Sequence, residues 1–304
     1  MINEDIREYI GTIVPPEDIF SNELLRGHTT FRVGGEAELF IKISNQDQLV
    51  KLIPFFNRLE IDYFILGNGS NVLVSDNGYQ GVILQIGEHM SEVTVNGNII
   101  TAQAGVLLSK LAAIACEHGL TGMEFASGIP GTVGGGIMMN AGAYDGEMAQ
   151  ITQSVVIMNK AGELMELNHD TMEFGYRTSV VKNRPYIVME VTLALTVGNK
   201  EDIKAKMEQL ARQRREKQPL EYASAGSTFK RPHGHYAGKL IMDAGLRGFS
   251  IGGACVSEKH CGFVVNRGNA TATDILEVIK EIQDRVYDRF DVTLEPEVIC
   301  LGDF

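Results

Sequence analysis

Two glycine-rich stretches contain the residues whose types and spacing point most directly to chemistry. The first is GNGSN (67–71), which follows a predicted strand, and the second is the uncharged run Phe125–Tyr144, in which six of the twenty residues are glycine. Glycine permits positive φ angles and a close approach between backbone and ligand. Consecutive backbone N–H groups in such turns form concave anion sites that suit phosphates. Two such stretches favour a diphosphate, and hence a large cofactor, over turns that only pack against a sheet.

The familiar nucleotide-binding motifs are absent from the sequence. GNGSNV has the G-x-G of a dinucleotide fingerprint but lacks its third glycine, and no GxxxxGK[ST] P-loop occurs. A dinucleotide would therefore have to bind by another scheme. The glycine run is long enough to span a bilayer. Pro130, Asn140 and the glycines make a poor helix and break up its apolar residues, so we reject a transmembrane segment.

Composition and charge narrow the class of protein. The chain has 304 residues, of which 44% are apolar and 22% are charged, as in ordinary globular proteins. A formal net charge of −12 disfavours binding to nucleic-acid phosphates, although a small anionic ligand in a local pocket stays compatible with it. The acidic, polar start MINEDIREYI does not resemble a signal peptide. We expect a cytoplasmic protein.

Metal and disulfide chemistry are not expected. The four cysteines form no CxxC pair and are scattered: Cys116, Cys255, Cys261 and Cys300. Their spacing argues against a zinc knuckle or a thioredoxin-type redox site, and a chain with a sizeable core does not need a disulfide framework. His233 and His235 flank Gly234, but two loop histidines without nearby carboxylates are more often bystanders than metal ligands.

The periodicity of apolar residues predicts an α+β fold. After a leading helix, strands 38–43 and 62–66 with the helix 46–59 predict a βαβ-like unit. Short strands with turn residues follow, and Asn96-Gly97 is a hairpin signal. This middle part is also predicted to contain a helix at 107–119 and to end in the strand 186–195.

The C-terminal part is predicted to be a separate α+β domain. We place its boundary near Gly198-Asn199 and expect three domains, 1–80, 81–198 and 199–304. The predicted elements of the last domain are helices at 200–217 and 236–245, a hairpin at 253–266, a long helix that opens at Thr273, and a final strand at 292–302.

Six sequence blocks, in this order, resemble the UDP-N-acetylenolpyruvoylglucosamine reductase (MurB) family. They are TTFRVGGEAELF (29–40), ILGNGSNVLVSD (65–76), EFASGIPGTVGGGIMMNAGAY (124–144), FGYRTS (174–179), AGSTFKRP (225–232) and LEPEV (294–298). Their order and spacing, over about residues 25–304, are far more specific than any single block. The resemblance implies two FAD-binding subdomains of the fold shared with vanillyl-alcohol oxidase, followed by a C-terminal α+β substrate-binding domain.

The resemblance also implies cofactors, a reaction and partners. FAD is expected to bind non-covalently, since neither glycine stretch contains the His or Cys through which relatives attach flavin. NADPH is expected to reduce the flavin at N5, and hydride then passes to C3 of UDP-N-acetylglucosamine enolpyruvate, giving UDP-N-acetylmuramate for peptidoglycan synthesis. The only partner expected is this nucleotide-sugar substrate, with no nucleic acid, no membrane insertion and no obligate protein partner.

By the same resemblance, the FAD contacts lie in the glycine loops, whose backbone amides hold the pyrophosphate. They are Arg32; Gly67, Asn68, Gly69, Ser70 and Asn71; Ser127, Gly128, Ile129, Pro130, Gly131, Thr132, Val133, Gly134 and Gly135; and Asn140, Gly142 and Ala143.

Three residues match the family's catalytic positions. Arg177, in FGYRTS, is expected to grip the substrate carboxylate while enolate-like charge develops on it, because a guanidinium fork fits a carboxylate. Ser227 is expected to donate the proton to C2, and Glu297 to stabilise the enol or relay protons. Outside their motifs, the same three residues would be interpreted as a surface arginine, a turn serine and a solvated glutamate.

Five further residues are candidates for the uridine diphosphate and the sugar: Tyr144, Tyr176, Lys217, Arg231 and Asn266. Lys217 would otherwise belong to a solvated helix end. Only VVKNRP separates FGYRTS from the next strand. The chain therefore resembles the shorter, second class of the family, which lacks the insertion with a tyrosine that covers bound substrate.

Two other functions stay open from the sequence. An FAD-dependent sugar or lactone oxidase of the same superfamily would lack the C-terminal set GSTFK…LEPEV. A non-catalytic flavin or nucleotide-sugar binding module would need no proton donor, so the presence of Arg177, Ser227 and Glu297 argues against it.

Overall fold

The computed structural model describes residues 2–304, which form two compact units. The chain passes back and forth between the units. Unit 1 comprises the chain up to Ser21, Glu38–Asn68 and Gly81–Gln213, and unit 2 comprises Asn22–Ala37, Gly69–Gln80 and Arg214–Phe304.

This division differs from the three successive domains expected from the sequence. Residues 22–37 and 69–80 belong to unit 2, although the sequence places them in the first domain. The physical reason is a shared core, because Phe31 and Leu73 are buried in one apolar cluster with Ile275 of the C-terminal helix. Packing between segments so far apart in sequence leaves no trace in local periodicity.

The first sheet contains the βαβ unit that the sequence predicts. Helix α2 (Gln46–Arg58) connects β2 to β3, and β3 pairs in parallel with β5. The Asn45 side chain caps α2 by accepting a hydrogen bond from the Gln48 N–H, and the helix continues past Pro54. Helix α1 (Glu4–Gly11) is the predicted leading helix. The strand order is β1 (Ile19–Leu24), β2 (Glu36–Ile43), β5 (Tyr79–Ile86) and β3 (Tyr63–Leu66).

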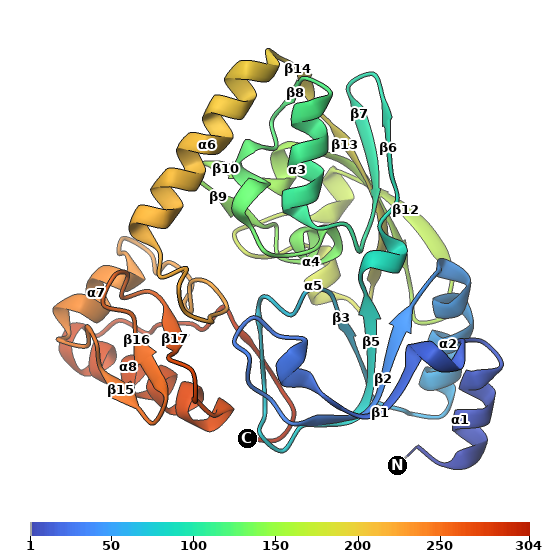
Figure 1. Ribbon diagram of the computed structural model, residues 1–304, viewed down its shortest axis with the longest axis horizontal. Helices are drawn as coiled ribbons and strands as arrows, with labels where there is room; N and C mark the ends of the chain where they lie inside the picture. Colours follow the sequence, from blue (N-terminus) through green and yellow to red (C-terminus); the bar gives the residue numbers. More distant parts are fainter. Residues whose placement is uncertain (1) are drawn as a thin grey trace. The chain divides into compact units, whose positions relative to one another are not determined.

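The second sheet lies in unit 1 and is antiparallel throughout (Figure 1). Its β6–β7 hairpin turns at Gly97, whose φ of +62° matches the predicted Asn-Gly turn. The strand order is β12 (Leu164–Asn168), β11 (Thr152–Met158), β13 (Ile187–Ala194), β7 (Ile99–Gln103) and β6 (Val93–Asn96). The shorter strands of the unit are β8 (Leu120–Thr121), β9 (Gly142–Ala143), β10 (Gly146–Glu147) and β14 (Thr196–Val197).

Two helices of unit 1 follow β7 and matter for the site. Helix α3 (Leu108–Glu117) is the predicted helix of the middle part, and α4 (Val133–Met138) forms within the glycine run. Helix α4 packs against β13 and β7, and the short helix α5 (Val180–Asn183) packs against α4.

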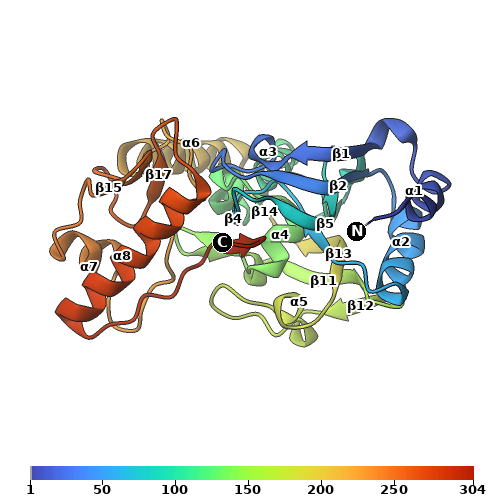
Figure 2. The ribbon, with the colours of Figure 1, turned by 90° about the horizontal axis from the view of Figure 1, so that it is seen from below.

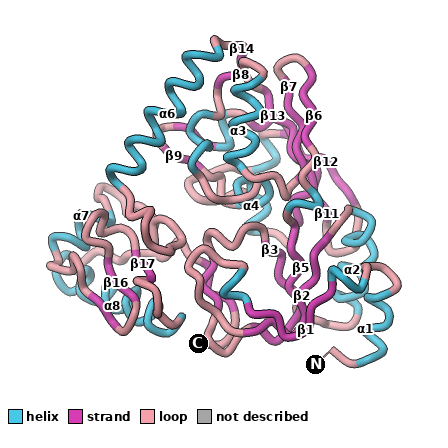
Figure 3. Tube along the Cα trace, viewed as in Figure 1, coloured by secondary structure: helices cyan, strands magenta, loops and turns pink. Residues whose placement is uncertain are grey.

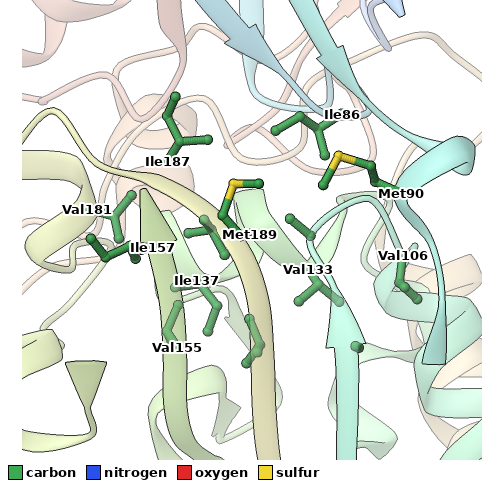
Figure 4. Close-up of a cluster of buried hydrophobic side chains, with 14 of the residues drawn as sticks. Ile86, Met90, Val106, Val133, Ile137, Val155, Ile157, Val181, Ile187 and Met189 are labelled. Atoms are coloured by element: carbon green, nitrogen blue, oxygen red, sulfur yellow. The ribbon is translucent and has the colours of Figure 1, made fainter. Parts of the chain in front are cut away.

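The core of unit 1 fixes α4 in place (Figure 4). Val133 and Ile137 of α4 are fully buried, together with Val155 of β11 and Val106, which precedes α3. Each such side chain contributes about 1.5–3 kcal/mol of burial free energy. The glycine helix is therefore held by its branched apolar residues. Of its glycines, Gly136 is also buried, whereas Gly135 is exposed.

Unit 2 is built around one long helix. Helix α8 (Ala272–Phe290) packs across the three-stranded sheet β15 (Ser250–Ile251), β16 (Ala254–Val256) and β17 (Val264–Asn266), and α7 (Ala237–Asp243) contacts α8 (Figure 2). The parallel pair β4 (Val72–Val74) and β18 (Ile299–Leu301) completes the unit. Helix α6 (Lys200–Lys217) leads into it from unit 1. Figure 3 shows the stretch between α6 and α7 as loop.

Two predicted element bounds in unit 2 were wrong. The long helix begins at Ala272 rather than Thr273, because Thr271 caps it in a capping box with Asp274. Only Ile299–Leu301 of the predicted strand 292–302 is a strand, and Pro296 before it forms a single bridge with Phe229. Proline has no N–H to continue a ladder. Within residues 2–304, no helix is long and apolar enough to cross a membrane.

Candidate active site

The glycine run turns from a short 3₁₀ helix (Glu124–Gly128) through a loop into α4. The N–H groups of Val133 and Gly134 donate to the carbonyls of Val106 and Ala104, both at 2.8 Å. A Cβ on Gly134 would lie 3.0 Å from the Ala104 Cβ. Gly134 therefore permits close packing against Ala104, which precedes α3. Such packing is the structural role that a glycine can have without binding a ligand.

The loop before α4 keeps donors for a ligand. Asn68 donates from Nδ2 to the Pro130 carbonyl at 2.6 Å, and a Cβ on Gly67 would lie 2.5 Å from the Thr132 Oγ1. Among the hydrogen bonds of residues 2–304, none is donated by the backbone N–H of Gly131 or Thr132. Two adjacent free donors in an uncharged loop, beside a second glycine turn, fit the pyrophosphate of FAD.

The rest of GNGSN belongs to unit 2. Gly69 is buried with a φ of +59°, and its carbonyl accepts a hydrogen bond from the Thr30 N–H at 3.1 Å. A Cβ at Gly69 would overlap the His28 carbonyl oxygen, so only glycine fits. Arg32 is exposed and also has a positive φ, +57°. Ser70 is half-buried.

Arg177 lies at the tip of a tight turn in unit 1. The backbones of Gly175 and Thr178 exchange two hydrogen bonds, 3.0 and 3.3 Å long, and the turn gives Arg177 a φ of +57°. The Arg177 Nη2 donates to the Gly142 carbonyl at 3.2 Å. Positive φ is strained for arginine, and such strain concentrates at functional sites.

A hollow of about 220 Å³ lies beside this turn and brings together five of the expected site residues. Gly142 and Ala143 were expected to contact FAD, Tyr144 and Tyr176 the substrate, and Arg177 is the expected catalytic cation. The hollow is also lined by Asp145, Gly146, Glu147 and Gln150, which sequence reasoning missed. Their only sequence signal was their position directly after the glycine run.

Ser227 and Glu297 lie in unit 2, on two backbone segments that pair with each other. The Glu297 N–H donates to the Thr228 carbonyl at 2.8 Å, and the Lys230 N–H donates to the Glu295 carbonyl at 2.9 Å. Ser227 is exposed, whereas Thr228 beside it is fully buried. The pairing holds Ser227 at the surface on a fixed frame.

The two glutamates of LEPEV differ in their surroundings. Glu295 is exposed and forms an ion pair with Lys230. Glu297 is half-buried, and its carbonyl accepts a 3.0 Å hydrogen bond from the Asn71 Nδ2. Asn71, expected to contact FAD, thus also holds the backbone of an expected catalytic residue.

The remaining expected substrate residues differ in how they are placed. Tyr144 and Tyr176 are exposed in unit 1, and Lys217 is exposed at the end of α6. Arg231 is exposed, with its guanidinium 4.0 Å from the Tyr236 ring centre.

Asn266, the fifth expected substrate residue, does not reach the surface. It is 6% exposed, donates to the Phe31 carbonyl, and accepts from the N–H groups of Gly268 and Ala270. These three bonds use its amide to hold the turn before α8. Its role in this structure is to bind the protein's own backbone.

Burial sets the ionisation of three groups on strands and loops of unit 2. Desolvation raises the pKa of the Cys255 and Cys261 thiols. Desolvation also lowers the pKa of His260, whose Nδ1 accepts from the Gly262 N–H at 3.1 Å. Within residues 2–304, no group of three or more His, Cys, Asp or Glu side chains is placed to hold a metal ion.

Two family models place the chain in the class of FAD-binding oxidoreductases. Residues 37–168 match the family model described as an FAD binding domain. Residues 218–301 match the model described as the C-terminal domain of UDP-N-acetylenolpyruvoylglucosamine reductase.

Similarity to full-length relatives places the chain in one family. It is 47% identical, over 100% of both chains, to the UDP-N-acetylenolpyruvoylglucosamine reductase of Clostridioides difficile (strain 630). It is 48% identical to that of Caldanaerobacter subterraneus subsp. tengcongensis, over 99% of both. The chain belongs to the UDP-N-acetylenolpyruvoylglucosamine reductase (MurB) family.

Solved structures agree on the fold. The crystal structure of MurB from Thermus caldophilus has a TM-score of 0.81 and 34% identity, covering 93% of this chain and 98% of its own. A glucose dehydrogenase, Phl p 4.0202, shares the fold over 64% of this chain and 44% of its own, with a TM-score of 0.50 and 14% identity.

Proposed function

We propose that this chain reduces UDP-N-acetylglucosamine enolpyruvate to UDP-N-acetylmuramate in peptidoglycan synthesis, with NADPH as the electron donor and non-covalent FAD as the cofactor. The observation that carries the proposal is the pairing of the Ser227 segment with Glu297 inside the domain that matches the reductase family. Ser227 is exposed and Glu297 is half-buried, and they lie on two backbone segments that pair with each other, an arrangement that suits delivery of a proton.

Three residues of this chain carry the chemistry in this proposal. When bound, FAD carries hydride from NADPH to the enolpyruvyl carbon. Arg177 holds the substrate carboxylate and stabilises the negative charge that develops on it. Ser227 donates the proton that completes the reduction at C2, and Glu297 stabilises the enol or relays the proton to Ser227.

The binding residues divide by ligand. The loops Gly67–Asn71 and Ser127–Gly135 hold FAD, with Arg32, Gly142 and Ala143 nearby. Tyr144, Tyr176, Lys217 and Arg231 are the candidates for the nucleotide-sugar. We assign FAD binding to the segments 1–80 and 81–198, of which residues 22–37 and 69–80 belong to unit 2, and substrate binding to 199–304. The proposed enzyme is cytoplasmic and of the class without the tyrosine insertion.

The alternative of a sugar or lactone oxidase rests on the shared FAD-binding fold, which a glucose dehydrogenase also has. That similarity covers 64% of this chain at 14% identity and supports only a shared fold. The match of residues 218–301 to the reductase domain favours the reductase.

An anaerobic absorbance titration tests the proposal. The purified protein is expected to be yellow, to bleach with NADPH, and to regain its colour on addition of UDP-N-acetylglucosamine enolpyruvate. Flavin that is reoxidised by oxygen but not by this substrate would support the oxidase instead. A protein that takes up no FAD would overturn both enzymatic functions.

A further inference from the structure

We propose that Asn140 is a positioning residue for Arg177, and that it acts by holding the turn at whose tip Arg177 lies. The inference rests on the proposed role of Arg177 in gripping the substrate carboxylate. The sequence assigned Asn140 to FAD binding, whereas the contacts of its side chain lead to the catalytic turn.

The amide of Asn140 connects three segments of unit 1. Its Nδ2 donates to the Gly175 carbonyl at 3.0 Å, and its Oδ1 accepts from the Ala149 N–H at 2.9 Å. These partners fix the orientation of the amide, because a carbonyl needs a donor and an N–H needs an acceptor. Asn140 is 1% exposed, so both ends of its side chain serve the protein interior.

The end of α4 holds the Arg177 turn on both sides. Asn140, just after α4, bonds to Gly175 at the start of the turn. Ser179, the residue after the turn, donates from Oγ to the carbonyl of Met138, the last residue of α4, at 3.1 Å. The turn is therefore clamped at two points to a helix that the apolar core fixes in place.

The clamp counteracts backbone strain. Arg177 has a φ of +57°, a backbone conformation that is unfavourable for arginine. Such a conformation persists only where contacts with the surrounding structure hold it. Asn140 has a φ of +40°, which asparagine tolerates better than most residues. The strained conformation directs the Arg177 guanidinium to the Gly142 carbonyl and into the wall of the hollow. Losing the clamp would let the guanidinium leave that place.

The decisive variant is Asn140→Asp. It keeps the size, the tolerance of positive φ and the acceptor for Ala149, but places a carboxylate oxygen against the Gly175 carbonyl. The matched control is Asn57→Asp, because the half-buried Asn57 also donates from Nδ2 to a carbonyl of unit 1, that of Lys160 at 3.0 Å. Asn140→Gly, which removes the side chain and tolerates positive φ, is the second variant if the first takes up no FAD.

Two half-reactions separate positioning from cofactor binding. For Asn140→Asp we expect normal FAD content and normal bleaching by NADPH, with reoxidation by UDP-N-acetylglucosamine enolpyruvate slowed about tenfold to hundredfold, since small misplacement of a catalytic group has effects of this size. Asn57→Asp should reoxidise at the wild-type rate. An equal slowing of both half-reactions, or loss of FAD from both position-140 variants, would overturn the proposal.

A double-mutant cycle tests whether Asn140 acts through Arg177. Arg177→Lys should slow reoxidation strongly in the wild type and much less in the Asn140→Asp background, because residues that act as a unit are not additive. Additive effects would overturn the proposal.

Amide hydrogen exchange provides a readout independent of activity. Peptides covering residues 173–183 should exchange faster in Asn140→Asp than in Asn57→Asp, and unchanged exchange would count against the clamp. If the wild type failed to turn over the substrate, the proposed function would fall, while the exchange experiment would still report on the contact between Asn140 and the turn.

Discussion

The backbone N–H of Glu297 donates a 2.8 Å hydrogen bond to the carbonyl of Thr228, the residue that follows Ser227. On its other side, the Glu297 carbonyl accepts from the Asn71 Nδ2, and the Ile299 N–H donates to the Asn71 carbonyl, both at 3.0 Å. The backbone of Glu297 is thus held at both its N–H and its carbonyl. The expected proton donor and its partner share one frame, so changes to that frame should affect both.

Replacing Ser227 should impair one half-reaction only. In Ser227→Ala, flavin reduction by NADPH should be unchanged, whereas reoxidation by the enolpyruvyl substrate should fall about 10²–10⁴-fold, the usual contribution of a positioned acid. Anaerobic stopped-flow absorbance measures the two rates separately. Ser224→Ala, three residues earlier, serves as the control. Wild-type reoxidation in Ser227→Ala would remove Ser227 from its proposed role.

Replacing Thr228 should destabilise the frame itself. Its Oγ1 accepts a 3.0 Å hydrogen bond from the buried Val264 N–H, and the side chain is fully buried. In Thr228→Val that N–H has no partner, which should lower the free energy of unfolding by about 1–3 kcal/mol. Urea denaturation followed by circular dichroism measures the change. Thr228→Ser keeps the acceptor and should recover most of the loss, so equal losses in both variants would contradict this account.

The sequence was sufficient where local signals decide the structure. The apolar periodicity of residues 46–59 predicted α2, and Asn96-Gly97 predicted the β6–β7 hairpin. The glycine run was also identified as unusual backbone, and its last three residues, Gly142, Ala143 and Tyr144, line one hollow together with Arg177, whereas no residue of GNGSN lines it.

The domain division and the roles of the buried asparagines could not be predicted, because they depend on contacts between segments that are distant in sequence. The burial of Phe31 against α8 moved residues 22–37 out of the expected first domain, and no local pattern encodes it. Asn266 looked like a ligand-binding side chain, but its three hydrogen bonds go to the protein's own backbone. Asn140 has the same character. The residue type and its neighbours in the sequence are the same whether an asparagine binds a ligand or a carbonyl of its own chain.

Two glycines of α4 should respond oppositely to alanine. A Cβ on Gly134 would lie 3.0 Å from Ala104, so Gly134→Ala should destabilise the protein by about 1–3 kcal/mol. Gly135 is exposed, with the nearest atom at 3.7 Å, so Gly135→Ala should not destabilise the FAD-free protein, since alanine favours helix by about 1 kcal/mol over glycine. Thermal unfolding of the FAD-free protein compares the two.

Comparing Gly134→Ala with Gly135→Ala also distinguishes a glycine needed for packing from a glycine proposed to contact FAD. Gly135→Ala is expected to weaken FAD binding without loss of FAD-free stability, because its Cβ projects from the turn proposed to hold the pyrophosphate. Titration of the FAD-free variant with FAD, followed by flavin fluorescence, measures the affinity. Unchanged affinity would move the cofactor contact away from Gly135.

Acid should weaken the start of α8 through Asp274. Hydrogen bonding from the Thr271 N–H, with a further bond from the Gly253 N–H, holds the pKa of this carboxyl below its usual value. A carboxyl with a lower pKa in the folded state stabilises the fold above its unfolded pKa, about 3.9, and loses that contribution as the pH falls through the folded pKa. Denaturant unfolding from pH 7 to pH 3 should therefore show that the wild type is more stable than Asp274→Asn near neutrality, and that the two free energies of unfolding converge in acid.

Asp288→Asn, at the exposed far end of α8, is the control, and its free energy of unfolding should follow that of the wild type at every pH. A constant gap between wild type and Asp274→Asn at every pH would mean that the amide replacement perturbs packing rather than removing the charge-dependent cap.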